Sequence, residues 1–337
     1  GAPNTNDSNQ GVTTMKSTPM RTLCALVAGL VWIGQASAAE TKLTLSTFTI
    51  PSLSAFTPPV IKAKGFDKAN GLDLTFVAKP AGLYRTDFAA GTNKLGGSGT
   101  ILADVAKLNE KGVETIFLFN VFDFWGTVVV GAKSGINTLK DLEGKSLAAS
   151  LPTTNYAMFR FFAKEAGLDM SKVEVQSSPV PGLVPMAASG RVDAVQMWEP
   201  AHSVLTYKND KYRAFDLVSD WKKKSGISSG MPYLGVAAHK DWVTANKPLI
   251  PKLFNTYKAA ADFIIANPKE AAKIVSDSSK GKLKADVLES FIRSDRLGLR
   301  VYYPGKERDS AAAAFKAAMS IGYLKKLPSP GVLYDGP

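Results

Sequence analysis

Apolar and polar residues along the chain follow two spacings, which predict strands interleaved with helices. Short runs rich in β-branched and apolar residues, bounded by turn-forming residues, are typical of strands. These runs are 43–48, 72–77, 113–119, 127–131, 146–150, 173–176, 194–197 and 233–238. Apolar positions three or four residues apart indicate helices. These stretches are 58–65, 84–90, 153–166, 183–189, 248–266, 268–278, 282–293 and 308–323.

Alternating strands and helices are typical of α/β proteins, whose sheets are mostly parallel. The four helices between 248 and 323 follow the last expected strand, so the chain should end in a helical part. No repeat of solenoid length and no low-complexity linker interrupts the pattern. The sequence therefore predicts two α/β lobes with mostly parallel sheets and a helical C-terminal part.

The N-terminal region has the features of a signal peptide. A short basic start at 15–21 precedes an apolar run of about eleven residues, 23–33, which is too short to span a bilayer. The small residues Ala36 and Ala38 form the pattern that a signal peptidase cuts. We therefore expect an exported, periplasmic protein cleaved near Ala38, with the signal peptide at 15–38. Residues 1–14 are interpreted as a tag or upstream extension.

Composition excludes several kinds of site. The one cysteine, Cys24, lies inside the expected signal peptide, so the mature chain has neither a disulfide nor a cysteine-rich metal site. Two histidines, His202 and His239, leave little for metal chemistry, and no cofactor or metal is expected. The net charge of +12 comes from scattered lysines and arginines with one dense run at 222–224. No basic stripe is interleaved with aromatic residues, so we expect no nucleic-acid partner.

Four motifs, in order, carry a family resemblance. Residues 61–74 (IKAKGFDKANGLDL) are similar to an A-x-x-x-G-F-F-x-x-x-G-L-D stretch, with Asp67 in place of the second aromatic residue. Residues 136–145 (INTLKDLEGK), 190–195 (GRVDAV) and 197–201 (MWEPA) match three further patterns. Together they resemble the periplasmic solute-binding proteins of ABC importers, in the nitrate, sulfonate and taurine group with its thiamine-pyrimidine-precursor-binding relatives.

The resemblance implies a two-lobed, Venus-flytrap fold of the type 2 periplasmic binding proteins. One lobe would hold 41–127 plus 231–330, the other 128–230, and a small-molecule solute would bind between them. The protein would be a monomer without catalytic activity. It would deliver its solute to a membrane permease that is driven by an ATPase subunit.

Two segments with a strand–turn–helix order are candidates for binding an anion. In open α/β sheets, ligands collect at the carboxyl ends of strands, where helix N-termini offer unpaired N–H groups. Residues 96–100 (GGSGT) are expected to follow a short strand and to open a helix that runs to about Lys111. Residues 151–155 (LPTTN) open the helix 153–166 in the other lobe. Simple helix capping remains the alternative for each segment.

The loop after the first strand and aromatic residues at strand ends complete the candidate site. An aromatic lining suits an organic ligand, and ordinary core packing is the alternative interpretation. Glu199 either accepts a hydrogen bond from a ligand amine or stabilises the helix start at Pro200. Arg85 and Arg160 could reach an anionic ligand, but both are interpreted as exposed helix positions. The candidate ligand-binding residues are Thr49, Ser52, Ser54, Phe56, Gly97, Ser98, Gly99, Thr100, Phe124, Trp125, Thr153, Thr154, Tyr156, Trp198, Glu199 and Tyr233.

The helix starts favour an acidic ligand group, and the aromatic residues favour an organic body. We therefore expect a small organic anion, a sulfonate or carboxylate that is either aliphatic or aromatic. Nitrate would need few apolar residues around it, so the aromatic residues favour an organic ligand over nitrate. The alternatives are an enzyme on the same fold, similar to a thiamine-pyrimidine synthase or a desulfinase, or a ligand-sensing module for a receptor. The desulfinase type requires a nucleophilic cysteine, which the mature chain lacks.

Overall fold

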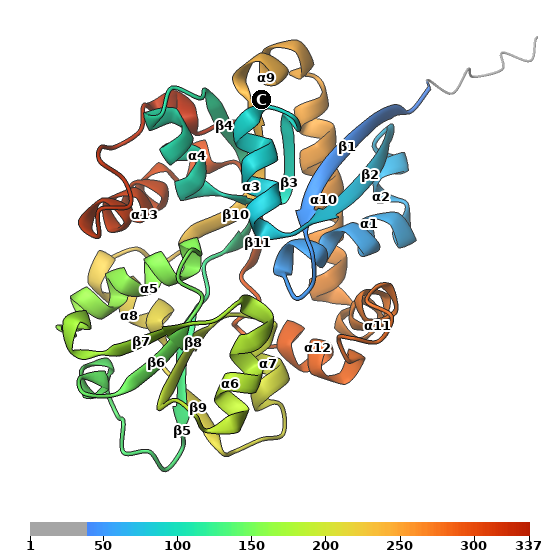
Figure 1. Cartoon of the computed structure of the whole chain (residues 1–337). Coiled ribbons are helices and arrows are strands. Elements are labelled where there is room, and N and C mark those ends of the chain that lie inside the picture. Colours follow the sequence, from blue (N-terminus) through green and yellow to red (C-terminus); the bar gives the residue numbers. More distant parts are fainter. Residues whose placement is uncertain (1–38) are drawn as a thin grey trace, which may run out of the picture. The chain divides into compact units, whose positions relative to one another are not determined.

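The computed structural model of the protein describes residues 39–337. The expected signal peptide at 15–38 and the preceding residues 1–14 lie outside the described residues. Two separate sheets, each flanked by helices, make up the described unit (Figure 1). The α/β class and the two-sheet architecture predicted from the sequence are confirmed.

The first sheet has six strands in the order β11-β4-β10-β3-β1-β2. β1 runs parallel to β2 and β3, whereas β10 pairs antiparallel with β3 and β4, and β11 pairs antiparallel with β4. These strands are β1 (Thr41–Phe48), β2 (Leu72–Lys79), β3 (Leu95–Ile101), β4 (Thr115–Asp123), β10 (Pro232–His239) and β11 (Leu299–Tyr302).

The second sheet has five strands in the order β7-β6-β8-β5-β9. β6 is parallel to β7 and β8, and β5 is antiparallel to β8 and β9. The strands are β5 (Thr127–Gly131), β6 (Ser146–Ala149), β7 (Glu174–Ser177), β8 (Ala194–Met197) and β9 (Tyr212–Ala214). Both sheets are therefore mixed, not mostly parallel as expected. The chain crosses to the second sheet in β5 and returns in β10, and both crossing strands run against their neighbours.

Helices cover the sheets and also connect them. α10 packs against α1, α2 and β4, α4 lies against β3, β4 and β10, and α13 contacts both α4 and α5. The α-helices are α1 (Thr57–Lys64), α2 (Phe66–Ala69), α3 (Ala81–Ala90), α4 (Leu102–Glu110), α5 (Thr154–Glu165), α6 (Leu183–Ser189), α7 (Ala201–Thr206), α8 (Leu217–Ser225), α9 (Lys240–Asn246), α10 (Leu249–Ala266), α11 (Pro268–Ser278), α12 (Ala285–Ile292) and α13 (Arg308–Ser320). Short 3-10 helices lie at Leu53–Ala55, Leu139–Leu142, Met170–Lys172, Val180–Gly182, Pro304–Lys306 and Pro330–Val332.

The glycine-rich segment 96–100 lies inside β3, so its expected place at a helix start is wrong. All seven residues of β3 are buried, and the following helix begins at Leu102. The glycines let neighbouring groups approach closely: a Cβ on Gly97 would lie 2.5 Å from the backbone oxygen of Ser46 in β1. Close packing of β3 against its neighbours therefore explains this composition.

Asp67, which stands where the family motif has an aromatic residue, is buried in α2. Its Oδ2 accepts from Lys62 Nζ at 2.6 Å and from the Leu74 N–H at 3.0 Å. Burial alone would raise the pKa of this carboxyl, but these two donors hold it below its ordinary value of 3.8. The carboxylate thus connects α2 to α1 and to the start of β2.

Replacing Asp67 with asparagine is expected to lower the free energy of unfolding by about 2 kcal/mol at pH 7, because a charged acceptor with two donors is lost. Since the folded pKa lies below the unfolded one, the difference between wild type and Asp67→Asn should shrink as the pH falls below about 3.8. Urea denaturation at several pH values measures it. Asp73→Asn, at the exposed carboxylate 3.4 Å from the same lysine, is the matched control. A loss of stability relative to wild type that is equal in Asp67→Asn and Asp73→Asn would contradict the prediction. So would a loss in Asp67→Asn that does not depend on pH.

Candidate functional site

A cavity of about 300 Å³ lies between the two sheets. Its walls come from the end of β1 and the loop after it, the start of α3, the ends of β3 and β4, the start of α5, and the residue after β8. We call it the cleft cavity. Its lining residues are Phe48, Thr49, Ile50, Pro51, Ser52, Leu53, Pro80, Ala81, Arg85, Ile101, Asp123, Trp125, Thr153, Thr154, Asn155, Val180, Pro181, Trp198, Tyr233 and Leu234.

Several residues expected at the site lie together on this cavity, although they come from distant parts of the chain. Those that line it are Thr49, Ser52, Trp125, Thr153, Thr154, Trp198 and Tyr233. Gly99 and Thr100 line a neighbouring groove instead. The remaining candidates, which line neither space, are Ser54, Phe56, Gly97, Ser98, Phe124, Tyr156 and Glu199.

Hydroxyl groups of β3 and of the helices beside it bond to nearby protein groups and do not line the cleft cavity. Ser54 accepts from the Phe48 N–H at 2.8 Å, and Ser98 donates to the Ser54 carbonyl at 3.0 Å. Ser98 also lies 3.3 Å from the Thr57 hydroxyl. Thr100 is hydrogen-bonded to the Tyr84 hydroxyl. These five hydroxyls therefore stabilise the packing of β1, β3 and the helices around them.

Three candidate aromatic residues pack into the protein interior. Phe56 makes an edge contact with Phe291 at 5.7 Å between ring centroids. Phe124 stacks on Phe162 at 5.7 Å, and Tyr156 packs on Phe159. These rings therefore belong to the core, which was the alternative interpretation of the sequence.

Glu199 is fully buried and its two oxygens are occupied by protein groups. Oε1 lies 2.9 Å from His202 Nδ1 and accepts from Arg296 Nε at 2.8 Å. Oε2 accepts from the Ser203 N–H at 3.1 Å, in the first turn of α7. Although burial opposes ionisation, His202 and Arg296 hold the pKa of Glu199 below its ordinary value. Glu199 is thus a buried ionic link at the helix start and does not face the cleft cavity.

The start of α5 presents backbone donors to the cleft cavity. Thr153 caps the helix: its side chain accepts from the Tyr156 N–H at 3.2 Å and donates to the Ser150 carbonyl at 2.7 Å. The N–H groups of Thr154 and Asn155 have no acceptor within the helix, as in any first turn. With the partial positive charge of the helix end, these N–H groups favour an anion.

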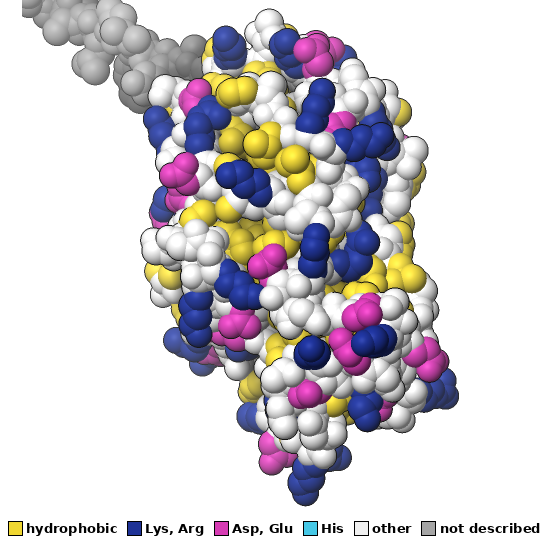
Figure 2. Space-filling view, turned by 90° about the vertical axis from the view of Figure 1, so that its left-hand side faces the viewer, with side chains coloured by type: hydrophobic (Ala, Val, Ile, Leu, Met, Phe, Trp, Pro, Cys, Tyr) yellow, Lys and Arg dark blue, Asp and Glu magenta, His cyan; other side chains and the backbone are white. Residues whose placement is uncertain are grey.

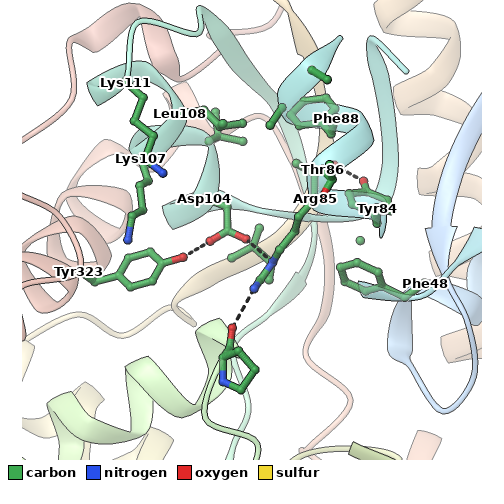
Figure 3. A pocket seen from close by; sticks show the side chains of 17 residues that line it. Phe48, Tyr84, Arg85, Thr86, Phe88, Asp104, Lys107, Leu108, Lys111 and Tyr323 are labelled. Carbon is green, nitrogen blue, oxygen red and sulfur yellow. Dashed lines mark hydrogen bonds and ion pairs between the residues drawn. The ribbon is translucent and has the colours of Figure 1, made fainter. Parts of the chain in front are cut away.

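Arg85 of α3 reaches across from the first sheet to the second (Figure 3). Its Nη1 donates to the Pro152 carbonyl at 2.9 Å and its Nη2 to the Thr154 hydroxyl at 2.7 Å. Its Nε lies 3.2 Å from Asp104 Oδ2 in α4. Burial alone would lower the pKa of Arg85, but the Asp104 carboxylate together with Tyr323 and Tyr233 raises it above its ordinary value. Arg85 is therefore charged and lies beside the start of α5.

Asp104 joins the same network from the other side. Its Oδ1 accepts from the Thr154 hydroxyl at 3.0 Å and from the Tyr323 hydroxyl, which follows α13. Burial and the Asp104 charge both raise the pKa of Tyr323, so this phenol stays protonated and donates. Both sheets are thus connected at the rim of the cleft cavity by one carboxylate and one guanidinium.

Aromatic rings form much of the remaining wall. Trp125 lies 5.0 Å from the His202 ring, and Tyr233 meets Phe124 edge-on at 5.3 Å. Burial raises the pKa of Tyr233, which therefore remains a neutral hydroxyl. Trp198 is half-buried. The cavity accordingly combines large apolar surfaces with a few placed donors, as small-molecule sites do.

The sequence left several lining residues unassigned. Phe48 and Asp123 are the last residues of β1 and β4, a position that itself indicates the ligand edge of a sheet. Asn155 belongs to the helix start that the sequence did identify. Arg85 was interpreted as an exposed position, which is wrong, because its partners Asp104 and Thr154 come from other elements.

Residues 39–337 contain neither a candidate metal site nor a candidate membrane-spanning helix. No cluster of three or more metal-ligating side chains occurs in this part of the chain. None of its helices is both long and apolar enough to cross a membrane. Lysines and arginines are spread over the face drawn in Figure 2 and do not gather into a stripe.

Solved structures of other proteins share the fold. The periplasmic aliphatic sulphonate binding protein SsuA of Escherichia coli is 15% identical, with a TM-score of 0.68 over 83% of this chain and 91% of that one. The alkanesulfonate-binding protein SsuA of Xanthomonas axonopodis pv. citri, bound to MOPS, is 18% identical, with a TM-score of 0.65 over 88% and 96%. A putative periplasmic sulfonate-binding protein of Methylobacillus flagellatus is 14% identical, with a TM-score of 0.65 over 88% and 92%.

These similarities show the two-sheet fold of the periplasmic binding proteins. The comparison with curated proteins gave no match. The model of the family described as NMT1/THI5 like matches residues 59–271, which include both sheets except β1 and β11. Because this match spans more than half of the 337 residues, the chain belongs to the NMT1/THI5-like family.

Proposed function

We propose that the protein is the periplasmic solute-binding component of an ABC importer and captures a small organic anion in the cleft cavity. The observation that carries the proposal is the start of α5, whose unpaired N–H groups border a cavity with tryptophan and tyrosine walls. An acidic ligand group would bind at the helix start, and an aliphatic or aromatic body would lie against the rings.

The family and the fold support this proposal. Structural neighbours are described as sulfonate-binding proteins, so a sulfonate or carboxylate is the first ligand class to test. The two lobes, 41–127 with 231–330 and 128–230, would close around the solute. The loaded protein, a monomer, would then dock on a permease with its ATPase subunit.

We propose binding and not catalysis. His202 is paired with Glu199, His239 Nε2 lies 2.5 Å from the Phe88 carbonyl, and neither lines the cleft cavity. A general base for chemistry on the ligand is therefore not provided by histidine. The cavity volume of about 300 Å³ suits a molecule of a few to about a dozen heavy atoms.

Calorimetric titration and thermal unfolding with ethanesulfonate, benzenesulfonate, benzoate and nitrate test the proposal. A ligand at 100 times its dissociation constant should add about 2.7 kcal/mol to the free energy of unfolding. Ethyl methyl sulfone and benzamide are the neutral controls and should not bind. Binding of nitrate alone, or equal binding of the neutral controls, would contradict an organic anion held at a helix start.

Trp198→Ala is expected to weaken binding of the organic anion by about tenfold or more, because part of the cavity wall is removed. The anion used is the one that binds wild type most tightly. Trp198→Phe, which keeps an aromatic surface, should retain most of the affinity. Calorimetry below the unfolding range of each variant measures this. An affinity that is unchanged in Trp198→Ala would place the ligand elsewhere.

A further inference from the structure

A second, larger space adjoins the cleft cavity on the first sheet. It has a volume of about 740 Å³ and lies between α3 and α4 (Figure 3). We call it the outer groove. It shares Phe48, Arg85 and Ile101 with the cleft cavity, so the two spaces meet at these side chains. Pro152 borders the outer groove, while the next residue, Thr153, borders the cleft cavity.

Arg85 lies at this junction. Its guanidinium bonds to the Pro152 carbonyl and the Thr154 hydroxyl, with Asp104 at its side. These contacts hold a positive charge at the junction of the two spaces. The charge lies beside the helix start at which we propose that the acidic group binds.

The middle of the outer groove is apolar. α3 and α4 face each other here across β3, and small or apolar side chains line the space between them. These residues are Phe88, Ala89, Ala90, Val105 and Leu108. This apolar surface stabilises methylene groups and aromatic rings, although Thr86 and Asp104 also line the groove.

The far end of the outer groove is basic. Lys107 lies in the last turn of α4 and Lys111 is the residue that follows this helix, and both line the groove. The Lys107 ammonium lies 4.1 Å from the centroid of the Tyr323 ring. Neither lysine has a carboxylate of residues 39–337 within 4.0 Å. Two cations without an acidic partner, beyond an apolar stretch, suit a second anionic group.

We infer that the protein takes an elongated organic dianion, with one acidic group at the start of α5, its chain in the outer groove and its second acidic group at Lys107 and Lys111. This inference rests on the proposed function. The occupant of the outer groove would be the ligand itself, because the groove meets the cleft cavity at Phe48, Arg85 and Ile101 and the two lysines are complementary in charge to the second acid.

Calorimetry with ethanesulfonate, decane-1-sulfonate and 10-carboxydecane-1-sulfonate tests the inference. Each methylene that enters the outer groove should tighten binding by about fourfold. The terminal carboxylate should tighten binding further by about tenfold, and Lys107→Gln with Lys111→Gln should remove that last gain while leaving decane-1-sulfonate within about twofold.

Ala90→Trp fills the outer groove from an exposed position of α3 and needs no change in the core. The substitution should lower the affinity for decane-1-sulfonate by at least about tenfold. The affinity for ethanesulfonate should change by less than about twofold. Leu83→Trp is the matched control, because Leu83 is on the same helix, is 51% exposed and lines neither space.

The outcomes separate the two proposals. If ethanesulfonate binds but decane-1-sulfonate is no tighter, or is equally affected by both tryptophan variants, the inference is overturned and the proposed function stands. The inference is also overturned if the terminal carboxylate gives no gain. If none of the three sulfonates binds, the inference is overturned, and the proposed function falls as well only if benzenesulfonate and benzoate also fail to bind. Tighter binding of the longer probes that Ala90→Trp alone abolishes supports the inference.

Discussion

Replacing Glu199 with alanine is expected to lower the free energy of unfolding by about 3–5 kcal/mol, because the change leaves a positive charge without its partner. The Glu199 carboxylate is fully buried, and Arg296 donates to it from the segment between α12 and β11. His202 and Ser203 in α7 also bond to it. Urea denaturation at pH 7 measures the loss. The residue thus ties a helix of the second sheet to the C-terminal part of the chain.

A neighbouring ion pair supplies the control. Arg293 and Glu289 pair at 2.9 Å on the exposed face of α12, and Glu289→Ala should change stability by less than about 1 kcal/mol. Glu199→Gln keeps the size of the side chain and should fall between the two. A loss in Glu199→Ala no larger than in Glu289→Ala would show that the buried link contributes little.

The same link makes stability depend on pH. The folded pKa of Glu199 lies below its ordinary value of 4.5, so the folded state binds fewer protons than the unfolded state just below that pH. The stability difference between wild type and Glu199→Gln should shrink as the pH falls below about 4.5 and through the folded pKa. A difference that grows on acidification would contradict a lowered pKa.

The sequence pattern predicts most elements because their apolar positions have one clear period. β5, α6, β8 and α11 have the expected bounds. The missed elements are short or unusually polar. β9 and β11 have three and four residues, too few for a period, and α8 carries the basic run 222–224, which indicated only a charged surface.

Site residues could be predicted from sequence only where they lie at the end of a strand or the start of a helix. Ends of strands and starts of helices gather at one place in an α/β fold, so Trp125, Thr153 and Trp198 could be assigned to the cavity from sequence. The errors concern side chains whose partners are distant in the chain. Glu199 bonds to Arg296, and Arg85 bonds to Thr154, and no local pattern contains either pair.

The glycines of β3 were also misassigned, because the strand that they contact, β1, is distant in the chain. Gly97→Ala is expected to lower the free energy of unfolding by at least about 3 kcal/mol, at the upper end of what overpacking a core does. A Cβ at this position would lie 2.5 Å from the backbone oxygen of Ser46 and 3.4 Å from Leu45 Cβ. The obstacle is the backbone of β1 and cannot rotate away, so β1 and β3 would have to separate.

Gly82→Ala is the matched control, because no atom lies within 4 Å of a Cβ at this position in α3. It should leave stability unchanged or raise it by up to about 1 kcal/mol, since alanine favours a helix over glycine. Urea denaturation of both variants measures the difference. If Gly97 were part of a binding loop and not of a packed strand, Gly97→Ala would be about as stable as wild type and would change only ligand affinity. A loss of stability without ligand would instead show that the glycines are required by the contact between β1 and β3.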